Sequence, residues 1–449
     1  MKWVIAILMI SILVLFHEFG HFIVAKLSGV EVEEFSLGFG PRLISTVRGK
    51  TRYSLKLLLF GGSCLMKGMY PDDSDEDEDS DGQENEIPGD EESEEGSFQS
   101  ASIGRRIAIV LAGPFFNFIL SFVCAVVIIS AVGYDPAKVV SVTAGSSAEK
   151  AGLMAGDIIT SFMGQGVEVG RDVDSWFVFN DVNAGETVTM TVDRGGEKKE
   201  LAFTADDVTA YAMGINYTIG TDTAVLSAVS EGSPAAEAGL KAGDVITAVN
   251  GAEITDSSSL AEYFSENPLD GSEVTVAYER GGKETEVTLT PAERHGVSLG
   301  FYYNLGREKT DAVGVIRYSF VEIRYWIGAV LKSIGGMFTG RFSVNDLSGP
   351  VGIADVVGTA YEQSKDEGAY MTFLNMLYLI VALSANLGVM NLLPIPALDG
   401  GRFVFLLIEA ISGRPVNKKI ELAFQGVAAV LLMLLMVYVM YNDITKMLP

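Results

Sequence analysis

The stretch WVIAILMISILVLFHEFGHFIVA, residues 3–25, combines a long apolar run with side chains that can hold a metal ion. A membrane-spanning helix needs about 20 apolar residues, a length the run reaches only by continuing through HEFGH. His17 and His21 are four residues apart, so a helix places both imidazoles on one face, where they can share a zinc ion. Ionisable side chains inside a span are costly and usually functional. We therefore expect a first span over residues 1–27 that carries part of a metal centre.

Three more apolar runs follow, within a chain of 449 residues of which 48% are hydrophobic. Residues 107–132, 371–394 and 422–441 contain no charged side chain, and each is long enough to cross a bilayer as a helix. Residues 325–339 are interrupted by Lys332 and are more typical of an amphipathic helix at the membrane surface. A cleaved signal peptide is the alternative interpretation of the first run, but no small-residue cleavage site follows it. The fold class is therefore an α-helical membrane core of four spans.

A third metal ligand is found at the end of the third span, in the segment NLLPIPALDGG of residues 391–401. Pro394 and Pro396 break the helix, and irregular backbone at membrane depth is tolerated only where it is buried in protein or lines a watery cavity. Asp399 follows directly, at the same depth as His17 if the spans alternate in direction. A catalytic zinc takes about three protein ligands and leaves one position for water. Glu18, next to His17, can then act as the general base.

Charge indicates the orientation and excludes one class of partner. Basic residues concentrate between spans 1 and 2, from Lys26 to Arg106, and between spans 3 and 4, from Arg402 to Lys419, which places both loops in the cytoplasm and both termini outside. Residues 72–95 carry 15 of the 58 carboxylates, so the rest of the chain has a net charge of −11 instead of −26. This acidic run is expected to be disordered, as a solvated linker or as an electrostatic gate for a basic substrate tail. No basic patch suits nucleic acid.

Two similar segments lie between the second and third spans. AGSSAEKAGLMAGDIITSFMG (144–164) and EGSPAAEAGLKAGDVITAVNG (231–251) share 12 of 21 positions. In each, a glycine is placed where a short helix ends and an aspartate opens a strand. The pattern resembles the bacterial PDZ domain, which implies capture of peptide C-termini or extended segments by strand addition. The loops Met213-Gly214-Ile215 and Leu299-Gly300-Phe301 are candidate ligand loops. A role as a spacer or size filter is equally open.

The predicted organisation assigns almost every residue to one segment. In order, these are a first span with HEFGH (1–27), a cytoplasmic membrane-associated β region (28–70), an acidic disordered insert (71–98), a second span (103–133), two extracytoplasmic PDZ-like domains (135–215 and 216–305), an amphipathic region (306–369), a third span (370–395), a cytoplasmic loop with the LDG motif (396–421) and a fourth span (422–442).

HEFGH together with NLLPIPALDG resembles the site-2 protease family, whose pattern is H-E-x-x-H plus N-x-x-P-x-P-x-L-D-G. The tandem PDZ-like segments, GFGP (38–41), GPFFNF (113–118) and LSGPVGIA (347–354) resemble the bacterial regulator-of-sigma-E type of that family. The resemblance implies a zinc metalloendopeptidase of the bacterial inner membrane, with one zinc held by His17, His21 and Asp399 and with Glu18 as the catalytic carboxylate. It also implies single-span membrane substrates, such as an anti-sigma factor, cut in the second step of regulated intramembrane proteolysis.

A substrate helix must unwind before its carbonyls can be attacked, and its exposed backbone then needs polar partners. Asn391, Asn386 and Asn117 are amides inside spans that could bind it, or could join helices within the bundle. An edge of the β region over residues 31–68 could pair with the unwound segment. Two rival functions remain: a membrane scaffold or quality-control binding protein without proteolysis, and a metal transporter. The glutamate of HEFGH favours a protease, because transport needs ligands but no adjacent base.

Overall fold

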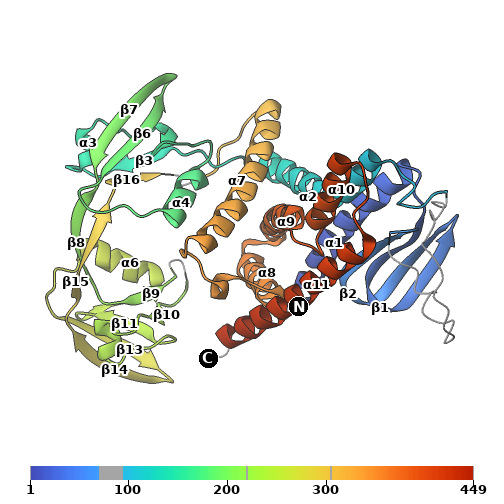
Figure 1. Ribbon diagram of the computed structural model, residues 1–449. Helices are drawn as coiled ribbons and strands as arrows, with labels where there is room; N and C mark the ends of the chain where they lie inside the picture. The colour runs from blue at the N-terminus through green and yellow to red at the C-terminus, as the bar shows by residue number, and fades with distance from the viewer. Residues whose placement is uncertain (1, 70–94, 219–220, 304–305, 448–449) are drawn as a thin grey trace. The chain divides into compact units, whose positions relative to one another are not determined.

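The computed structural model describes residues 2–69, 95–218, 221–303 and 306–447. It divides into two compact units: unit 1 is Met1–Pro136 with Gly306–Pro449, and unit 2 is Ala137–Leu305. Figure 1 shows that unit 1 is mostly helical, with one β hairpin, and that unit 2 is mostly strands with short helices. The chain therefore leaves the helical unit once, builds unit 2, and returns.

Unit 1 contains four helices that are long and apolar enough to cross a membrane. They are α1 (Lys2–Leu27), α2 (Ile103–Val132), α9 (Ala369–Leu392) and α11 (Lys418–Met447). Each overlaps one predicted span, and α11 is the one that differs most, since it begins four residues earlier and ends five residues later than 422–442. Sequence hydropathy thus identified the helices, whereas their ends follow from capping and packing.

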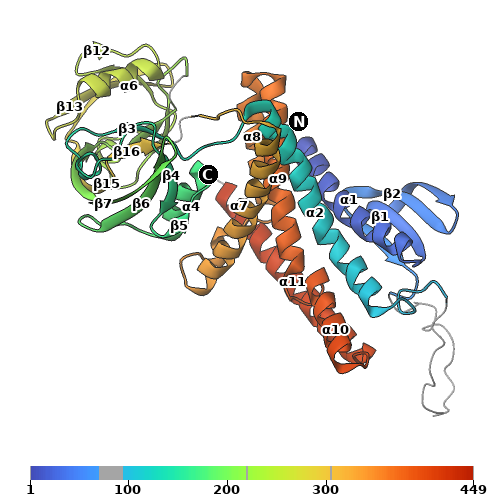
Figure 2. The same ribbon diagram turned by 90° about the horizontal axis from the view of Figure 1, so that it is seen from above.

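Helices α1, α2 and α9 pack side by side, as Figure 2 shows. Their contact surface is apolar, with Ala6, Met9, Leu120 and Val381 among its buried members. Two buried serines between α2 and α9 add hydrogen bonds: Ser121 Oγ donates to Val381 O (2.9 Å) and Ser384 Oγ donates to Asn117 O (2.8 Å). Small residues that allow close approach and hydroxyls that bond across it are typical of helix pairs in membranes.

The predicted amphipathic region contains two further helices, α7 (Ala312–Phe338) and α8 (Pro350–Ser364), with the 3-10 turns η2 (Val344–Asp346) and η3 (Lys365–Glu367). Helix α7 is longer than the expected 325–339. It packs against α2 through Phe320 and Phe122 (ring centroids 4.6 Å apart) and against α9 through Trp326 and Tyr378 (6.0 Å). Part of this region is therefore packed within unit 1.

Helix α11 is exposed along most of its apolar length and is held at its C-terminal end. Asp443 on α11 is 4% exposed, and its Oδ2 accepts hydrogen bonds from the backbone N–H groups of Gly349 (2.9 Å) and Gly352 (2.8 Å). A carboxylate at this place satisfies the free N–H groups at the start of α8 and complements the helix dipole. The segment LSGPVG of residues 347–352 thus receives a structural role.

The hairpin consists of β1 (Val32–Arg48) and β2 (Thr51–Met66), which pair antiparallel with several register shifts. Residues 32–37 have partners on two sides, 62–66 and 52–55, and residues 42–48 pair with 51–56. The two long strands are therefore folded into a compact sheet inside the predicted β region.

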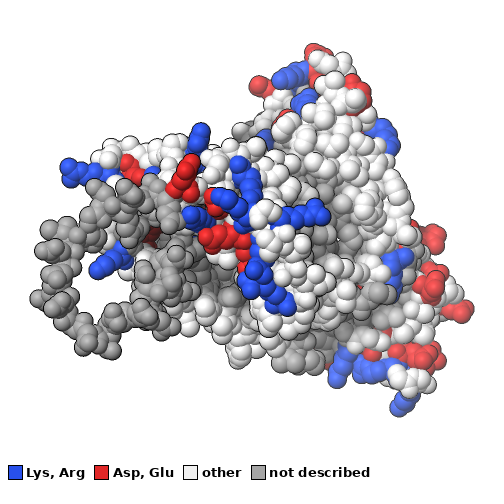
Figure 3. All heavy atoms as spheres, turned by 90° about the vertical axis from the view of Figure 1, so that its right-hand side faces the viewer, with Lys and Arg blue, Asp and Glu red and all other residues white. Residues whose placement is uncertain are grey.

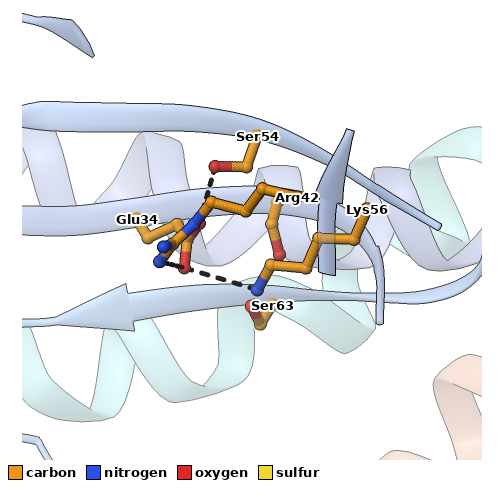
Figure 4. Close-up of polar contacts among 6 residues, drawn as sticks. Glu34, Arg42, Ser54, Lys56 and Ser63 are labelled. Atoms are coloured by element: carbon orange, nitrogen blue, oxygen red, sulfur yellow. Dashed lines mark hydrogen bonds and ion pairs between the residues drawn. The ribbon is translucent and has the colours of Figure 1, made fainter. Parts of the chain in front are cut away.

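Basic side chains around the buried Glu34 stabilise this sheet (Figure 4). Glu34 Oε1 accepts hydrogen bonds from Arg42 Nε (2.8 Å) and Ser54 Oγ (2.6 Å), and Lys56 Nζ lies 3.3 Å from Oε2. The Arg42 guanidinium lowers the pKa of Glu34 to about 2, although burial of the carboxylate opposes this shift. Glu34 is therefore ionised at neutral pH and links the neighbouring segments of the sheet.

Unit 2 contains two copies of one arrangement. The first copy has β3 (Val139–Val142), α3 (Ser147–Lys150), β4 (Ile158–Phe162), β5 (Gln165–Gly166), α4 (Gly170–Phe179), β6 (Thr187–Arg194) and β7 (Glu197–Thr204). The second has β10 (Leu226–Val229), α5 (Pro234–Glu237), β11 (Val245–Val249), β12 (Ala252–Glu253), α6 (Ser257–Glu266), β13 (Val274–Arg280) and β14 (Lys283–Leu289). As predicted, Gly152 and Gly239 end the short helices with φ of +87° and +90°, a region that favours glycine.

The two copies share an ion pair at the same position. Arg194 bonds to the buried Asp157 through Nε (2.6 Å) and Nη2 (2.7 Å), and Arg280 bonds to the buried Asp244 at the same two distances. Burial raises the pKa of each aspartate, but the hydrogen bonds and charge of the arginine, together with a hydrogen bond from a backbone N–H, outweigh it, so each pKa lies below its usual value. The internal repeat thus extends to a side-chain network that the sequence comparison did not include.

The strand pairing differs from the pairing expected for the two consecutive domains predicted at 135–215 and 216–305. Strand β16 (Phe301–Tyr303), at the end of unit 2, pairs with β3 of the first copy, and Phe301 lies in that copy's core. Strand β9 (Ile215–Tyr217), just after the first copy, pairs with β10 of the second, whose core contains Met213. Strands β8 (Asp206–Ala212) and β15 (Ala292–Ser298) pair antiparallel and connect the copies. The second copy is therefore inserted within the first. The candidate ligand loop at 213–215 belongs to the second copy, and the loop at 299–301 belongs to the first.

Most of the predicted acidic insert 71–98 lies outside the described residues. Residues 95–98 are described and belong to the base of the hairpin: Glu31 N–H donates to Gly96 O (2.8 Å), and Phe98 N–H donates to Lys67 O (2.7 Å). Phe98 is buried in a cluster with Val30 and Met66. The end of the insert is thus ordered, a correction to its predicted boundary, because an aromatic side chain and backbone hydrogen bonds anchor it.

Candidate metal centre

His17 and His21 lie on one face of α1, and their Nε2 atoms are 3.3 Å apart. Asp399, the first residue of α10 (Asp399–Ser412), brings its Oδ2 to 3.0 Å from His17 Nε2 and 3.3 Å from His21 Nε2. The histidines are 8% and 7% exposed. Side chains separated by 382 positions in the sequence therefore meet in one buried triangle, as the two motifs predicted.

The broken segment after α9 determines where Asp399 lies. Helix α9 ends at Leu392, and residues 393–398 have no regular structure; Ala397 has a φ of +76°. A side chain at Gly401 would lie 2.7 Å from Pro396 Cα, so only glycine permits this tight return. An apolar cavity of about 380 Å³ adjoins Pro396 and α11 residues that include Phe424 and Leu431. Pro394, Pro396 and the glycine pair after Asp399 thus turn the chain sharply, so that the carboxylate faces α1.

The triangle fits a zinc ion. Two imidazole nitrogens and one carboxylate oxygen face one another within 4.8 Å, and Asp399 Oδ2 is buried without a hydrogen-bond donor among the described residues. Zinc bonds of ~2.0–2.1 Å in a tetrahedron place ligand atoms about 3.3 Å apart. The observed separations of 3.0–3.3 Å agree with that value. Two His and one Asp form a ligand set typical of a catalytic zinc, which keeps its fourth position open.

Each histidine ring is also contacted from behind by α2. His21 Nδ1 lies 2.8 Å from Ile109 O, and His17 Nδ1 lies 3.1 Å from the side-chain amide of Asn117. At Gly113, between these two contacts, a side chain would lie 2.7 Å from His17 Cε1 and closer still to His21 Nε2. Gly113 therefore gives the imidazoles the space they occupy.

Glu18 is half-buried beside the metal ligands and faces the hairpin. A side chain at Gly62 of β2 would lie 3.2 Å from Glu18 Cγ, so the strand and the carboxylate are in close contact. Residues 62–66 pair with 32–37 on one side, and no described strand pairs with their other side. An edge with unpaired backbone groups thus lies next to the predicted general base.

The three asparagines predicted to bind substrate lie in different surroundings. Asn117 is 0% exposed and contacts His17, and its role in substrate binding stays a prediction. Asn386 and Asn391 are half-buried on α9, and their role in substrate binding stays a prediction. Sequence reasoning also missed Gly113, although Gly113 and Asn117 are four residues apart in GPFFNF and so share a helix face.

Basic residues gather where the hairpin lies. Lys26 at the end of α1 bonds to Thr51, Arg105 at the start of α2 bonds to Ser28 O, and Arg106 pairs with Glu409 of α10. Figure 3 shows Lys and Arg side chains concentrated on the face that lies at the right of Figure 1, where β1 and β2 are drawn. The ends of α1 and α2 that carry these charges are therefore at the same side of unit 1.

Comparison with known proteins follows the whole length of the chain. The model of peptidase family M50 matches residues 5–435. Zinc metalloprotease RasP of Shouchella clausii is 30% identical over 97% of both chains. Regulator of sigma-E protease RseP of Escherichia coli is 31% identical over 98% of both chains, and regulator of sigma-W protease RasP of Bacillus subtilis is 28% identical over 98% of this chain and 97% of that one.

Part of the chain also resembles a solved PDZ domain. The match to the HtrA3 PDZ domain bound to a phage-derived ligand has 24% sequence identity and a TM-score of 0.17. It covers 20% of this chain and 92% of the PDZ domain chain. A TM-score this low assigns no fold, so the PDZ identity of the two copies in unit 2 stays a prediction.

Proposed function

The chain belongs to peptidase family M50 and is a zinc metalloprotease, and we propose that it cuts single-span membrane proteins within or near their transmembrane segments. The observation that carries this proposal is the position of the metal centre. His17, Glu18 and His21 lie inside α1, a helix apolar and long enough to cross a membrane. A metal site for water-soluble substrates would not need to lie there.

When bound, zinc supplies Lewis-acid chemistry: it polarises a peptide carbonyl and lowers the pKa of water toward about 7. His17, His21 and Asp399 would hold it, and the half-buried Asp399 carboxylate would offset part of its charge. Glu18 takes a proton from the attacking water as oxygen bonds to the carbonyl carbon. The same carboxyl group then gives the proton to the departing nitrogen as the C–N bond breaks. Glu18 is therefore the catalytic residue, and its position next to His17 on α1 keeps it close to the metal ligands.

The substrate is proposed to bind as an added strand. A membrane helix shields its carbonyls by hydrogen bonds, so it must unwind, and its backbone then needs new partners. The edge of residues 62–66 offers such partners beside Glu18, and strand addition to an exposed edge is a common mode of peptide binding. Asn386 and Asn391, at the end of α9 near the broken segment, are proposed to bind the same unwound segment.

The biological setting rests on the relatives' names and on charge. RseP and RasP are named regulators of sigma-E and sigma-W protease, which supports a role in the second cleavage of regulated intramembrane proteolysis, for example of an anti-sigma factor. The basic residues at one side of unit 1 support a bacterial inner-membrane location in which the metal centre faces the cytoplasm and the termini lie outside. Unit 2 then lies outside the cytoplasm, where its two copies bind peptide C-termini or extended segments, or act as a size filter.

The proposal is tested with purified full-length protein in detergent and a model single-span substrate. We expect chelator-sensitive cleavage by the wild type and loss of cleavage in Glu18→Gln at equal zinc content. His295→Gln is the matched control, because His295 is the one histidine outside the metal centre and is exposed on β15. It should cut like the wild type.

Three outcomes contradict the proposal in different ways. Equal cleavage by the wild type and Glu18→Gln removes Glu18 from the mechanism. Zinc binding without cleavage of any of several single-span substrates favours the scaffold, and zinc flux across vesicles without cleavage favours the transporter.

A further inference from the structure

The two imidazoles of the metal centre can bind zinc through Nε2 only if each carries its proton on Nδ1. A neutral imidazole has one N–H donor and one acceptor nitrogen, and the group that contacts one nitrogen decides where the proton lies. In proteins, a partner of the second ring nitrogen fixes the tautomer and orientation of a metal-binding histidine. The contacts behind His17 and His21 are therefore part of the metal centre.

His21 has a partner that fixes its tautomer without ambiguity. Its Nδ1 lies 2.8 Å from Ile109 O. A backbone carbonyl can only accept, so Nδ1 carries the proton. In the neutral ring the lone pair is then on Nε2, which lies 3.3 Å from Asp399 Oδ2 and can bind a zinc ion held between them.

His17 has a different partner, the side-chain amide of Asn117. The nitrogen Nδ2 of Asn117 is placed 3.1 Å from His17 Nδ1, and Asn117 Oδ1 is buried without a hydrogen-bond partner among the residues that the structure describes. The oxygen and nitrogen of an amide have nearly the same shape, and their assignment has to follow from the hydrogen-bond network. Rotation of the amide by 180° brings Oδ1 to Nδ1, where it accepts the proton that zinc binding by Nε2 requires.

Asn117 is held where it can only act on His17. Its backbone oxygen accepts the Ser384 Oγ hydrogen bond from α9 (2.8 Å), and the residue is 0% exposed. Gly113, one turn earlier on the same face of α2, leaves the space in which both imidazoles lie. The amide is therefore fixed in position by the helix packing and aimed at one ring nitrogen.

We propose that Asn117 is a positioning residue of the metal centre, whose side-chain oxygen accepts from His17 Nδ1 and thereby keeps His17 in the tautomer that binds zinc. An amide suits this position better than a carboxylate does. It accepts the hydrogen bond without adding a second buried negative charge beside Asp399. The inference rests on the metal centre of the proposed protease. It is tested by metal binding and tautomer, so its failure is distinguishable from failure to cleave a substrate.

The first test needs no variant. The chain has three histidines, so histidine labelled with nitrogen-15 gives few signals, and exposed His295 serves as reference. In zinc-loaded full-length protein, we expect the nitrogen shifts of His17 and His21 to report a proton on Nδ1 and none on Nε2. An Nε2–H tautomer of His17 in the wild type overturns the proposal.

The second test compares Asn117→Leu, which has a similar size but no acceptor, with Asn117→Asp, which keeps an acceptor oxygen. Loss of such a partner typically weakens metal binding about 10–100-fold, and we expect that loss for leucine. Aspartate should lose less, because it keeps the acceptor oxygen although it adds a second buried charge. Ser121→Ala is the matched control, because it removes a hydrogen bond between α2 and α9 of similar length (2.9 Å) without touching a histidine. Zinc affinity is measured by competition with a chelator.

Two results of this comparison contradict the proposal. If Asn117→Leu binds zinc like the wild type, the amide has no role in the site. If leucine and aspartate variants lose affinity equally, or Ser121→Ala loses as much as Asn117→Leu, the effect belongs to helix packing. Should the leucine variant not fold, the tautomer measurement on the wild type still decides.

Discussion

Replacing Gly113 by alanine should empty the metal centre while leaving the helical unit folded. The added methyl group would lie 2.7 Å from His17 Cε1 and nearer to His21 Nε2, whereas ordinary contacts begin at 3.4 Å. The rings or α2 must therefore move by about 0.7 Å or more, which exceeds the ~0.5 Å within which a functional site has to be held. Misplacement of about 1 Å can reduce activity roughly 100-fold.

The stability change should be smaller than the functional one. Alanine in a helix gains about 0.5–1 kcal/mol over glycine, and overpacking a close contact costs about 1–3 kcal/mol. Overpacking therefore wins at Gly113, by about 2 kcal/mol or less. Gly104→Ala is the matched control on α2, because no atom lies within 4 Å of the methyl group it would add. It gains helix propensity without the clash.

The assay is zinc content and zinc affinity of purified protein, followed by cleavage and thermal unfolding. We expect Gly113→Ala to lose zinc affinity by at least tenfold and cleavage by roughly 100-fold. Gly104→Ala should match the wild type in zinc binding and cleavage. Wild-type zinc affinity in Gly113→Ala would refute the reasoning, because it would show that the imidazoles can accommodate the methyl group without leaving their zinc-binding positions.

Three further predictions concern other parts of the chain. Gly62→Val should lower cleavage without changing zinc affinity, because the side chain enters the space beside Glu18 Cγ (3.2 Å from an added Cβ) and not the ligand triangle; equal loss of zinc would contradict it. Asp443→Ala removes the carboxylate that caps α8 and should destabilise unit 1 by about 1–2 kcal/mol in thermal unfolding, whereas an unchanged melting temperature would deny the cap a role. The pKa of Asp244 is lower in the folded chain than its usual 3.8, since the hydrogen bonds and charge of Arg280 and the hydrogen bond from Lys241 N–H together outweigh the opposing effect of burial; the pair's stabilisation is therefore present above pH 3.8 and lost as the pH falls below it. The protection of β11 and β13 amides against hydrogen exchange should therefore fall at acid pH. In Arg280→Met the fall should begin at a higher pH, because Asp244, which is 1% exposed, then lacks its cation. Identical pH profiles for the wild type and the variant would contradict this account.

The metal triangle could be predicted from sequence because two separate rules converge on it. The spacing of His17 and His21 determines their common helix face, and the prolines before Asp399 mark a broken helix at the matching depth. Neither rule depends on how the helices pack. The same is true of the four apolar helices, which follow from hydropathy alone.

Contacts between helices were not predictable in this way. Asn117 carries the same side chain as Asn391, and only the rotation of α2 against α1 decides that it contacts His17. Asp443 gives no sign in the sequence that it caps α8, because its partners are backbone N–H groups almost a hundred residues earlier. In both cases the missing information is tertiary, and local patterns do not contain it.

The inserted arrangement of unit 2 reverses the order in which its parts can be completed during synthesis. A ribosome releases the chain from its N-terminus, and domains usually fold in that order. Here β3 must wait for β16, about 160 residues later, before the first copy has its last strand, whereas β9 to β14 of the second copy form one continuous segment. The copy that is translated second is therefore the first that can close, and the earlier one remains unfinished in the meantime. An interruption anywhere before residue 301 leaves the first copy without Phe301 in its core.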